Sequence, residues 1–370
     1  MVNVEEIIIN AIERKASDIH IAQGVRPIFR INRQLIEMES VAPLTHDDIL
    51  DVYNYFVKYN DGLDETFEKE KKLDLNFEIN DSRLRVNISL ANGNYVFTAR
   101  TIKKELPKFK DLNLPDVVRQ SALLPQGLIL VTGKSNSGKT TTLNALVNEL
   151  NQTENKKILM LENPIEYVHT SDKSLIIQKE VGDGKDCATF GEGATNALRE
   201  DCDILIVGEI RDRSTMDAAI EMAESGHLVI GTMHTRSCSE TIDRILSLYD
   251  LSDQLFIKYV LSSVLRVVIA QRLIRGKTGE LVMVPEIMIV DDAISGFIRK
   301  EKFSRSDIED AIQSRSEKGN ISFINSLANS ILDGYISMEQ ARRQVDDKDF
   351  ELLNRILAQL REKRNIYFNV

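Results

Sequence analysis

The chain has 370 residues, of which 42% are hydrophobic and 28% are charged, and its formal net charge is −10. This length allows two or three domains with a sizeable core, and the sequence holds no apolar run of about 18 residues that would span a membrane. The acidic balance argues against DNA or RNA as a partner, because unspecific nucleic-acid binding neutralises phosphates. The three cysteines are scattered and lack C-x-x-C spacing. Their arrangement argues against a four-cysteine zinc site and a disulfide framework, and favours a reducing compartment.

Residues 1–103 are predicted to form a small α/β domain. Near the N-terminus, apolar residues follow helical spacing without a preceding basic segment, which predicts a packed helix and not an export signal. Further on, 73–79 and 84–90 alternate apolar and polar residues around a turn at 80–82, and a third strand is expected over 95–102. This pattern indicates an antiparallel meander with one buried face and one polar face.

The middle of the chain is predicted to form a parallel sheet covered by helices on both faces. A charged, proline-containing stretch at 104–120 is expected to be the linker that precedes this sheet. Over residues 121–285 strands and helices then alternate, which is typical of a parallel α/β core. Four apolar strands are expected in this core, at residues 128–132, 158–161, 204–207 and 228–233.

Residues 286–370 are predicted to be a helical C-terminal region. Ser337 and Gln340 have the spacing of a capping box that begins a helix. The last helical pattern carries an apolar stripe, which either packs inside the protein or binds a neighbouring molecule. Helical patterns occur at three places in this region, 308–312, 323–332 and 350–360.

Residues 133–140 read GKSNSGKT and fit the phosphate-binding pattern G-x-x-x-x-G-K-[ST]. They follow an apolar strand and precede a helical pattern, so the N–H groups of the turn and the N-terminus of the helix face an anion. Lys139 is expected to reach the β- and γ-phosphate oxygens, and the Thr140 hydroxyl to bind Mg²⁺. The sequence therefore predicts a nucleoside triphosphate site. The residues expected to hold the nucleotide are Gly133, Lys134, Ser135, Asn136, Ser137, Gly138, Lys139, Thr140 and Thr141.

Acidic and imidazole side chains follow the other strands of the predicted core. Glu162 and Glu166 follow the strand at 158–161, Glu209 follows 204–207, and His234 follows 228–233. Each residue taken alone is readily explained as a solvated loop residue or a helix cap. Ligands bind at the carboxyl ends of strands in open α/β sheets, however, so we expect these four side chains to converge on the nucleotide.

The chemistry of phosphoryl transfer assigns a role to each of these residues. Glu209 occupies a Walker-B position, and because Gly208 stands before it where an Asp is usual, Mg²⁺ is expected to be held by Thr140 and bridging waters. Either Glu166 or Glu162 is expected to polarise the attacking water. His234 is expected to donate a hydrogen bond to the γ-phosphate or to sense its presence.

These motifs resemble those of the secretion and type IV pilus ATPases of the RecA-like class, and within that class the PilT-like pilus retraction ATPases. The resemblance runs from about residue 11 to 345 and includes several long, specific motifs. The matching segments are ASDIH (16–20), GVRP (24–27), RLRVN (83–87), GKSNSGKT (133–140), ENPIEYVH (162–169), ALRED (197–201), DILIVGEIRD (203–212) and GHLVIGTMHT (226–235).

The resemblance implies an N-terminal PAS-like α/β domain, a RecA-like P-loop ATPase core and a helical C-terminal region. It implies a homo-hexamer that hydrolyses ATP with Mg²⁺ to power type IV pilus retraction and twitching motility. In such a ring, Arg85 and Arg100 are the candidates to stabilise the γ-phosphate. The implied partners are an inner-membrane pilus platform protein and a paralogous ATPase. The implied location is cytoplasmic, peripherally associated with the inner face of the cell membrane.

Several departures from the family pattern bear on the activity and on the subfamily. Asn136 stands at a glycine position of the phosphate loop, where Asn is the non-glycine residue that best tolerates a positive φ. Asn163 replaces the family's Asp, and the segment 286–302 is a drifted form of the most diagnostic retraction motif. The alternatives are therefore a pilus assembly or secretion ATPase of the same superfamily and a weakly hydrolysing accessory ring subunit. A DNA-translocating motor is a further alternative, against which the acidic balance argues.

Overall fold

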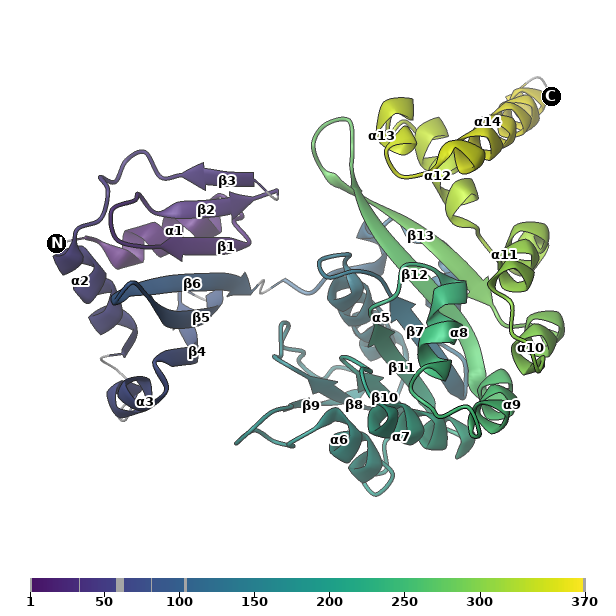
Figure 1. The fold of residues 1–370 in the computed structure, drawn as a ribbon, viewed down its shortest axis with the longest axis horizontal. Coiled ribbons are helices and arrows are strands. Elements are labelled where there is room, and N and C mark those ends of the chain that lie inside the picture. Colours follow the sequence, from purple (N-terminus) through teal and green to yellow (C-terminus); the bar gives the residue numbers. More distant parts are fainter. Residues whose placement is uncertain (1, 33, 58–62, 81, 103–104, 369–370) are drawn as a thin grey trace. The chain divides into compact units, whose positions relative to one another are not determined.

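The computed structural model describes residues 2–32, 34–57, 63–80, 82–102 and 105–368. It divides the chain into two compact units, Met1–Glu105 and Leu106–Val370 (Figure 1). Asp81 in the predicted turn and residues 103–104, where the predicted N-terminal domain ends and the predicted linker begins, lie outside the described residues. Within the part that the structure describes, none of the helices combines the length and the apolar character needed to cross a bilayer.

The first unit is an antiparallel sheet with helices. Its six strands lie in the order β3-β2-β1-β6-β5-β4. Its elements are α1 (Val4–Glu13), β1 (Asp18–Ile21), β2 (Ile28–Ile31), β3 (Gln34–Glu37), α2 (His46–Val57), α3 (Leu63–Glu70), β4 (Lys72–Ile79), β5 (Ser82–Ala91) and β6 (Asn94–Ile102).

Because apolar and polar residues alternate along the strands of the meander, this sheet has one apolar face and one polar face. Leu84, Val86 and Ile88 of β5 are buried, and the core that they form includes the apolar stripe of α1. The residues between them, such as Arg85, lie on the opposite face because successive side chains of a strand alternate. The predicted N-terminal helix and the predicted three-strand meander are thus confirmed.

The second unit is built on a seven-stranded sheet in the order β13-β12-β7-β11-β10-β8-β9, in which only the β12–β13 pair is antiparallel. The elements up to the last strand are η1 (Phe109–Asp111), α4 (Asp116–Ser121), β7 (Gly127–Thr132), α5 (Lys139–Thr153), β8 (Lys157–Glu162), β9 (Leu175–Glu180), α6 (Phe190–Ala197), β10 (Ile204–Val207), α7 (Arg213–Glu224), β11 (Leu228–Met233), α8 (Cys238–Leu246), α9 (Gln254–Val264), β12 (Leu265–Arg275) and β13 (Leu281–Ile289).

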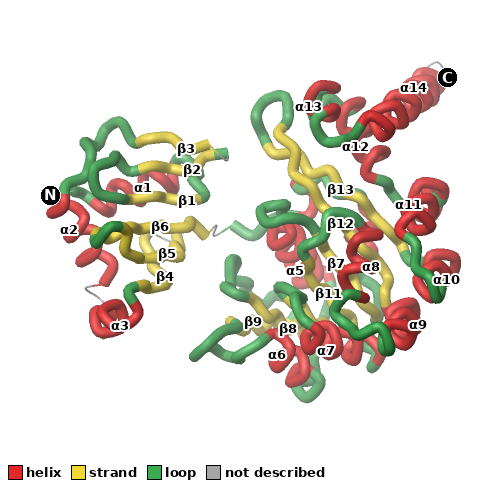
Figure 2. Tube along the Cα trace, in the orientation of Figure 1, coloured by secondary structure: helices red, strands yellow, loops and turns green. Residues whose placement is uncertain are grey.

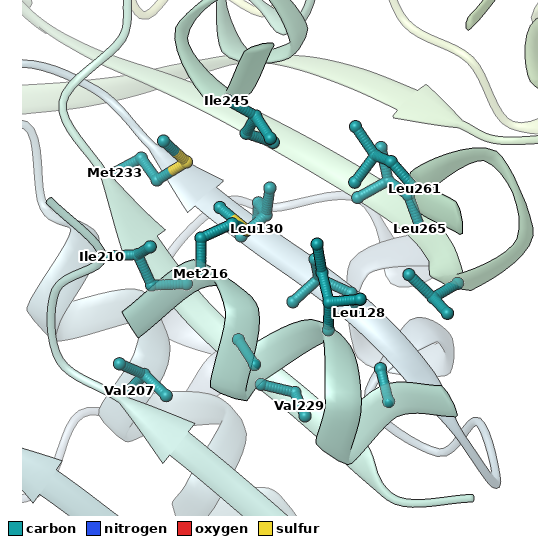
Figure 3. Packing of buried hydrophobic residues seen from close by; sticks show 14 of the residues in the cluster. Leu128, Leu130, Val207, Ile210, Met216, Val229, Met233, Ile245, Leu261 and Leu265 are labelled. Carbon is teal, nitrogen blue, oxygen red and sulfur yellow. The ribbon is translucent and has the colours of Figure 1, made fainter. Parts of the chain in front are cut away.

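Each central strand of this sheet contributes to two hydrophobic cores, one on each face. Leu128 and Leu130 of β7 belong to a core that includes residues of α6 to α11. Figure 3 shows part of this core, with Met216 of α7, Ile245 of α8 and Leu261 of α9. Ile129 and Val131 of the same strand pack on the other face with α4 and α5. Burial on both faces explains the nearly continuous apolar runs of these strands, and all four predicted core strands are confirmed.

The C-terminal region is helical, as predicted. It includes α13 with the predicted capping box at Ser337 and Gln340. The apolar stripe of α14 packs inside the protein, since Leu353, Ile356 and Leu357 are buried in a cluster with α12. The elements of the region are α10 (Asp292–Arg299), α11 (Arg305–Ser314), η2 (Ser316–Lys318), α12 (Phe323–Leu332), α13 (Met338–Arg342) and α14 (Asp347–Phe368).

One part of the fold was not anticipated from the sequence, the antiparallel hairpin of β12 and β13. The two strands run side by side at the edge of the sheet (Figure 2), and β13 extends past residue 285, where the predicted core ends. One end of the hairpin packs against the C-terminal helices through Ile274, Val282 and Val284. The hairpin therefore joins the sheet to the helical region.

Candidate nucleotide-binding site

The phosphate loop occupies the predicted turn between β7 and α5. Three of its residues have positive φ, namely Gly133 (151°), Asn136 (61°) and Gly138 (91°). At Gly133 a Cβ atom would lie 2.3 Å from the Ser137 Oγ and 2.6 Å from the Gln271 carbonyl oxygen. No side chain fits there, so the loop requires glycine at this position. The expectation that Asn136 adopts the glycine-like conformation is confirmed.

Lys139 lies inside the curve of this loop. It is 9% exposed, and its Nζ donates hydrogen bonds to the carbonyl oxygens of Gly133 at 2.9 Å and Lys134 at 3.1 Å. Burial lowers the pKa of Lys139, and the negative charges of Glu209 and Glu166 act against this shift. These two carboxylates therefore lie near the lysine, as predicted from the strand ends.

Glu209 and His234 lie side by side because their strands, β10 and β11, are neighbours in the sheet. The His234 Nε2 is 2.9 Å from the Glu209 Oε1, and the guanidinium group of Arg211 forms an ion pair with the same carboxylate. Burial, and then the charge of Lys139, lowers the pKa of His234. Its imidazole is therefore neutral at neutral pH, and it donates the Nε2 proton to the carboxylate.

The residue before Glu209 is glycine for a steric reason. A Cβ atom at Gly208 would lie 2.8 Å from the backbone oxygen of Leu161, and the Gly208 N–H donates a hydrogen bond to that same oxygen at 2.8 Å. An aspartate at this position would push β8 and β10 apart. Glu209 is therefore the acidic residue that this strand can present at its end.

The two candidate carboxylates, Glu162 at the end of β8 and Glu166 after it, differ in their surroundings. Glu162 is 4% exposed and accepts a hydrogen bond from the Gln178 Nε2 at 2.8 Å. Burial raises the pKa of Glu162 to about 7. Glu166 is half-buried, and its charge acts on Lys139. The Glu166 carboxylate thus lies near enough to act on the lysine of the phosphate loop, whereas Glu162 is enclosed in the protein.

Arg85 and Arg100 belong to the first unit, where they are cross-strand partners on β5 and β6. The Arg100 Nε forms an ion pair with Asp18 at 3.0 Å, and Arg30 is paired with the same carboxylate at 3.8 Å. Arg30 and Arg100 therefore both pair with one aspartate on this face of the sheet, and Arg85 lies beside Arg100. The role of Arg85 and Arg100 at the nucleotide stays a prediction.

A pocket of about 390 Å³ adjoins the phosphate loop. Gly138, Thr141 and Thr142 form its wall on the α5 side, and Leu273 and Met283 of the β12–β13 hairpin form the opposite wall. The residues that the hairpin contributes could not be identified from sequence motifs, because they are ordinary apolar strand residues. Their part in the site follows only from the pairing of β12 with β7.

Buried polar atoms in and below the loop fit a phosphate group. The hydroxyls of Thr132 and Ser137 are buried without a hydrogen-bond partner among the described residues. The described part of the chain also holds no group of three or more His, Cys, Asp or Glu side chains that could bind a metal ion. Nucleotide-bound Mg²⁺ needs only one or two protein oxygens, because phosphates and waters complete its shell. The Thr140 hydroxyl and the Glu209 carboxylate offer such oxygens.

A glycine-rich loop between a buried strand and a helix, with acidic groups at the neighbouring strand ends, defines a P-loop nucleoside triphosphatase. The sequence profile of the family described as "Type II/IV secretion system protein" matches residues 2–286, and the chain belongs to this family. It is accordingly an ATPase of the RecA-like class with an N-terminal α/β domain.

Two relatives and one solved structure show how far the similarity extends. The type IV pilus retractation ATPase PilT of Pseudomonas aeruginosa is 36% identical over 344 residues, which cover 92% of this chain and 98% of PilT. A twitching motility protein of Neisseria gonorrhoeae is 35% identical, with coverage of 78% and 77%. The crystal structure of the pilus retraction motor PilT with bound ADP has a TM-score of 0.82 at 34% identity, with coverage of 95% and 99%.

Proposed function

We propose that this protein is an ATP-hydrolysing motor that powers the retraction of type IV pili and thereby twitching motility. The observation that carries this proposal is the similarity to a retraction ATPase over 92% of the chain. The site supports it, because Lys139, Glu166, Glu209 and His234 come together at one edge of the sheet. An ATPase with these residues has the groups that phosphoryl transfer to water needs.

The geometry suggests a role for each side chain. The loop N–H groups and Lys139 bind the β- and γ-phosphates. Thr140 and, through water, Glu209 would hold Mg²⁺, which would supply positive charge against the phosphates. Glu166 orients the attacking water, because its charge acts on Lys139 of the loop while Glu162 is buried. Glu162 has a structural role. His234 holds Glu209 in place and responds when a γ-phosphate enters.

The apolar walls of the pocket beside the loop suit a nucleoside base. Thr141 and Thr142 line the pocket on the helix that follows the phosphate loop. A base lying against Leu273 and Met283 buries an apolar ring face while its phosphates remain in the loop. Binding pockets of this kind combine apolar walls with a few fixed polar groups.

We further propose that six copies form a ring in which an arginine of the N-terminal unit stabilises the γ-phosphate. Arg85 and Arg100 support this proposal, because they lie side by side on a polar sheet face. The ring acts on an inner-membrane pilus platform protein from the cytoplasmic side, with a paralogous ATPase as a further partner. An arginine so placed compensates charge that develops in the transition state.

Two experiments test the proposal. ATPase activity measured on size-fractionated protein is expected to coincide with a hexamer peak, and purified hexamer without turnover would identify an accessory ring subunit. Deletion of the gene is expected to give hyperpiliated, non-motile cells. Bald cells would instead identify an assembly ATPase.

Comparison of Glu166→Gln with Glu162→Gln tests the assignment of the water-positioning carboxylate. Both substitutions replace a carboxylate by an amide of the same size, one at the end of β8 and one four residues later. Glu166→Gln is expected to preserve ATP binding and lower turnover about 10²-fold or more, as loss of a positioned catalytic group does. Glu162→Gln is expected to retain most of the turnover. The reverse result would transfer the role to Glu162.

A further inference from the structure

The connection between β8 and β9, residues 163–174, carries Glu166 and lies along α5. We call it the β8–β9 segment. Several of its residues are hydrogen-bonded to α5, the helix that follows the phosphate loop. Near its middle, the Tyr167 hydroxyl is hydrogen-bonded to the Thr141 side chain. The position of Glu166 relative to the phosphates therefore depends on contacts between this segment and one helix.

Asn144 is the residue of α5 that makes the central contact. It is fully buried, one helical turn after Thr140. Its Nδ2 donates a hydrogen bond to the Thr140 carbonyl oxygen at 2.9 Å, and its Oδ1 lies 2.7 Å from the Nε2 of His169. The Asn144 side chain also lies close to Glu162. One amide thus contacts the end of the phosphate loop, the end of β8 and the β8–β9 segment.

The direction of these hydrogen bonds follows from their chemistry. Because the Asn144 Nδ2 donates to a carbonyl, the Oδ1 is the acceptor, and His169 must carry its proton on Nε2. Burial lowers the pKa of His169 to about 4. The imidazole is therefore neutral at physiological pH, and this contact keeps the same donor and acceptor.

Gln178 of β9 holds the other side of the same segment. Its Nε2 donates to the Tyr167 carbonyl oxygen at 2.7 Å and to Glu162 at 2.8 Å, while its Oε1 accepts from the His169 N–H at 2.8 Å. The backbone on the C-terminal side of Glu166 is thus bonded at Tyr167 and at His169. Asn144 links this bonded stretch to the phosphate loop.

We propose that Asn144 is a positioning residue that sets the place of Glu166 relative to the bound phosphates. It does so by joining the backbone of Thr140, at the end of the phosphate loop, to His169 in the β8–β9 segment. This inference rests on the proposed function, in which Glu166 orients the attacking water. The expected effect of Asn144 is on the rate of the chemical step and not on nucleotide affinity. Its side-chain hydrogen bonds go to the Thr140 carbonyl oxygen and to His169, and neither residue lines the pocket beside the loop.

Asn151 provides a matched control on the same helix. It lies two turns further along α5 and is 3% exposed. Like Asn144 it makes two side-chain hydrogen bonds, but both go to the β8–β9 segment. Its Nδ2 donates to the Thr170 carbonyl oxygen at 2.8 Å, and its Oδ1 accepts from the Asp172 N–H at 3.0 Å. Asn151 therefore matches Asn144 in residue type, burial and bonding, but it holds the part of the segment away from Glu166.

The test compares Asn144→Ala with Asn151→Ala in the full-length protein. Turnover, the KM for ATP, the affinity for a fluorescent ATP analogue and the melting temperature are measured for both variants. Asn144→Ala is expected to lower kcat by about 10- to 100-fold, as a displacement of about 1 Å of a catalytic group does. Its KM and its affinity for the analogue are expected to change by less than about threefold. Asn151→Ala is expected to lower the melting temperature but to keep kcat within about twofold of the wild type.

Equal loss of kcat in the two variants, or an unchanged kcat in Asn144→Ala, would overturn the inference. If Asn144→Ala does not fold, substitutions of His169, the partner of Asn144 in this contact, provide the test. His169→Gln keeps a donor near the Nε2 position and is expected to retain turnover, whereas His169→Phe, of similar size without a donor, is expected to lose it. Equal turnover in these two variants would overturn the inference as well. Failure of the proposed function is seen separately, as Glu166→Gln turning over ATP at the wild-type rate.

Discussion

Replacement of Gly208 by alanine tests how tightly β10 is packed against β8 just before Glu209. The added Cβ would lie 2.8 Å from the Leu161 carbonyl oxygen, 3.3 Å from the Glu162 Cα and 3.5 Å from the Phe190 Cε1. The nearest of these atoms, the Leu161 carbonyl oxygen, belongs to the backbone of a paired strand and cannot rotate away. The two strand ends must therefore separate.

The expected cost follows from these contacts. Overpacking of a closely packed site costs about 1–3 kcal/mol, and stretching the hydrogen bond from the Gly208 N–H to Leu161 forfeits up to about 1 kcal/mol of the same total. At about 2–4 °C per kcal/mol, the usual ratio for domains of 150–250 residues, the melting temperature is expected to fall by about 2–12 °C. Turnover is expected to fall as well, because Glu209 moves with the strand end.

Gly296→Ala is the matched control, measured by thermal unfolding alongside Gly208→Ala. Gly296 lies in α10, and a Cβ atom there has no neighbour within 4 Å. Alanine is a better helix former than glycine by about 0.5–1 kcal/mol, so the melting temperature is expected to rise by about 1–4 °C. If Gly208→Ala melts at or above the temperature of Gly296→Ala, the steric account of Gly208 is wrong.

Three further substitutions probe the site. Lys139→Ala is expected to abolish ATP binding in an equilibrium binding assay, and full affinity in this variant would place the nucleotide elsewhere. Glu209→Gln is expected to bind ATP normally but to turn it over about 10²-fold more slowly, and a wild-type rate would show that Glu209 is misassigned. Glu162→Gln is expected to change the pH dependence of stability. Burial raises the pKa of Glu162 from 4.5 to about 7 in the folded protein, so its contribution to stability is full below pH 4.5 and is lost as the pH rises through 7. The stability of Glu162→Gln relative to the wild type, measured by urea unfolding, is therefore expected to increase by up to about 1.4 kcal/mol per pH unit across this range. A difference that is independent of pH would contradict the buried state of Glu162.

Local patterns were sufficient to predict most of the secondary structure and the phosphate loop. The strand at 128–132, the loop at 133–140 and the helix after it are defined by neighbouring residues, whose spacing and backbone preferences act over a few positions. The alternation in 84–90 likewise identified the buried and polar faces of the meander. The convergence of Glu166, Glu209 and His234 near Lys139 was predictable too, because the carboxyl ends of parallel strands share one edge.

Other features depend on residues that are distant in the sequence, and only the tertiary structure decided them. Glu162 and Glu166 are both acidic residues after one strand, and it is Gln178, from the next strand in the sheet, that helps to enclose Glu162. Nothing in the sequence distinguishes Asn144 from other polar helix residues. Only the structure shows that the His169 Nε2 lies 2.7 Å from its Oδ1. The partners of a buried polar group come from whichever elements pack around it, so the residue type alone does not reveal its role.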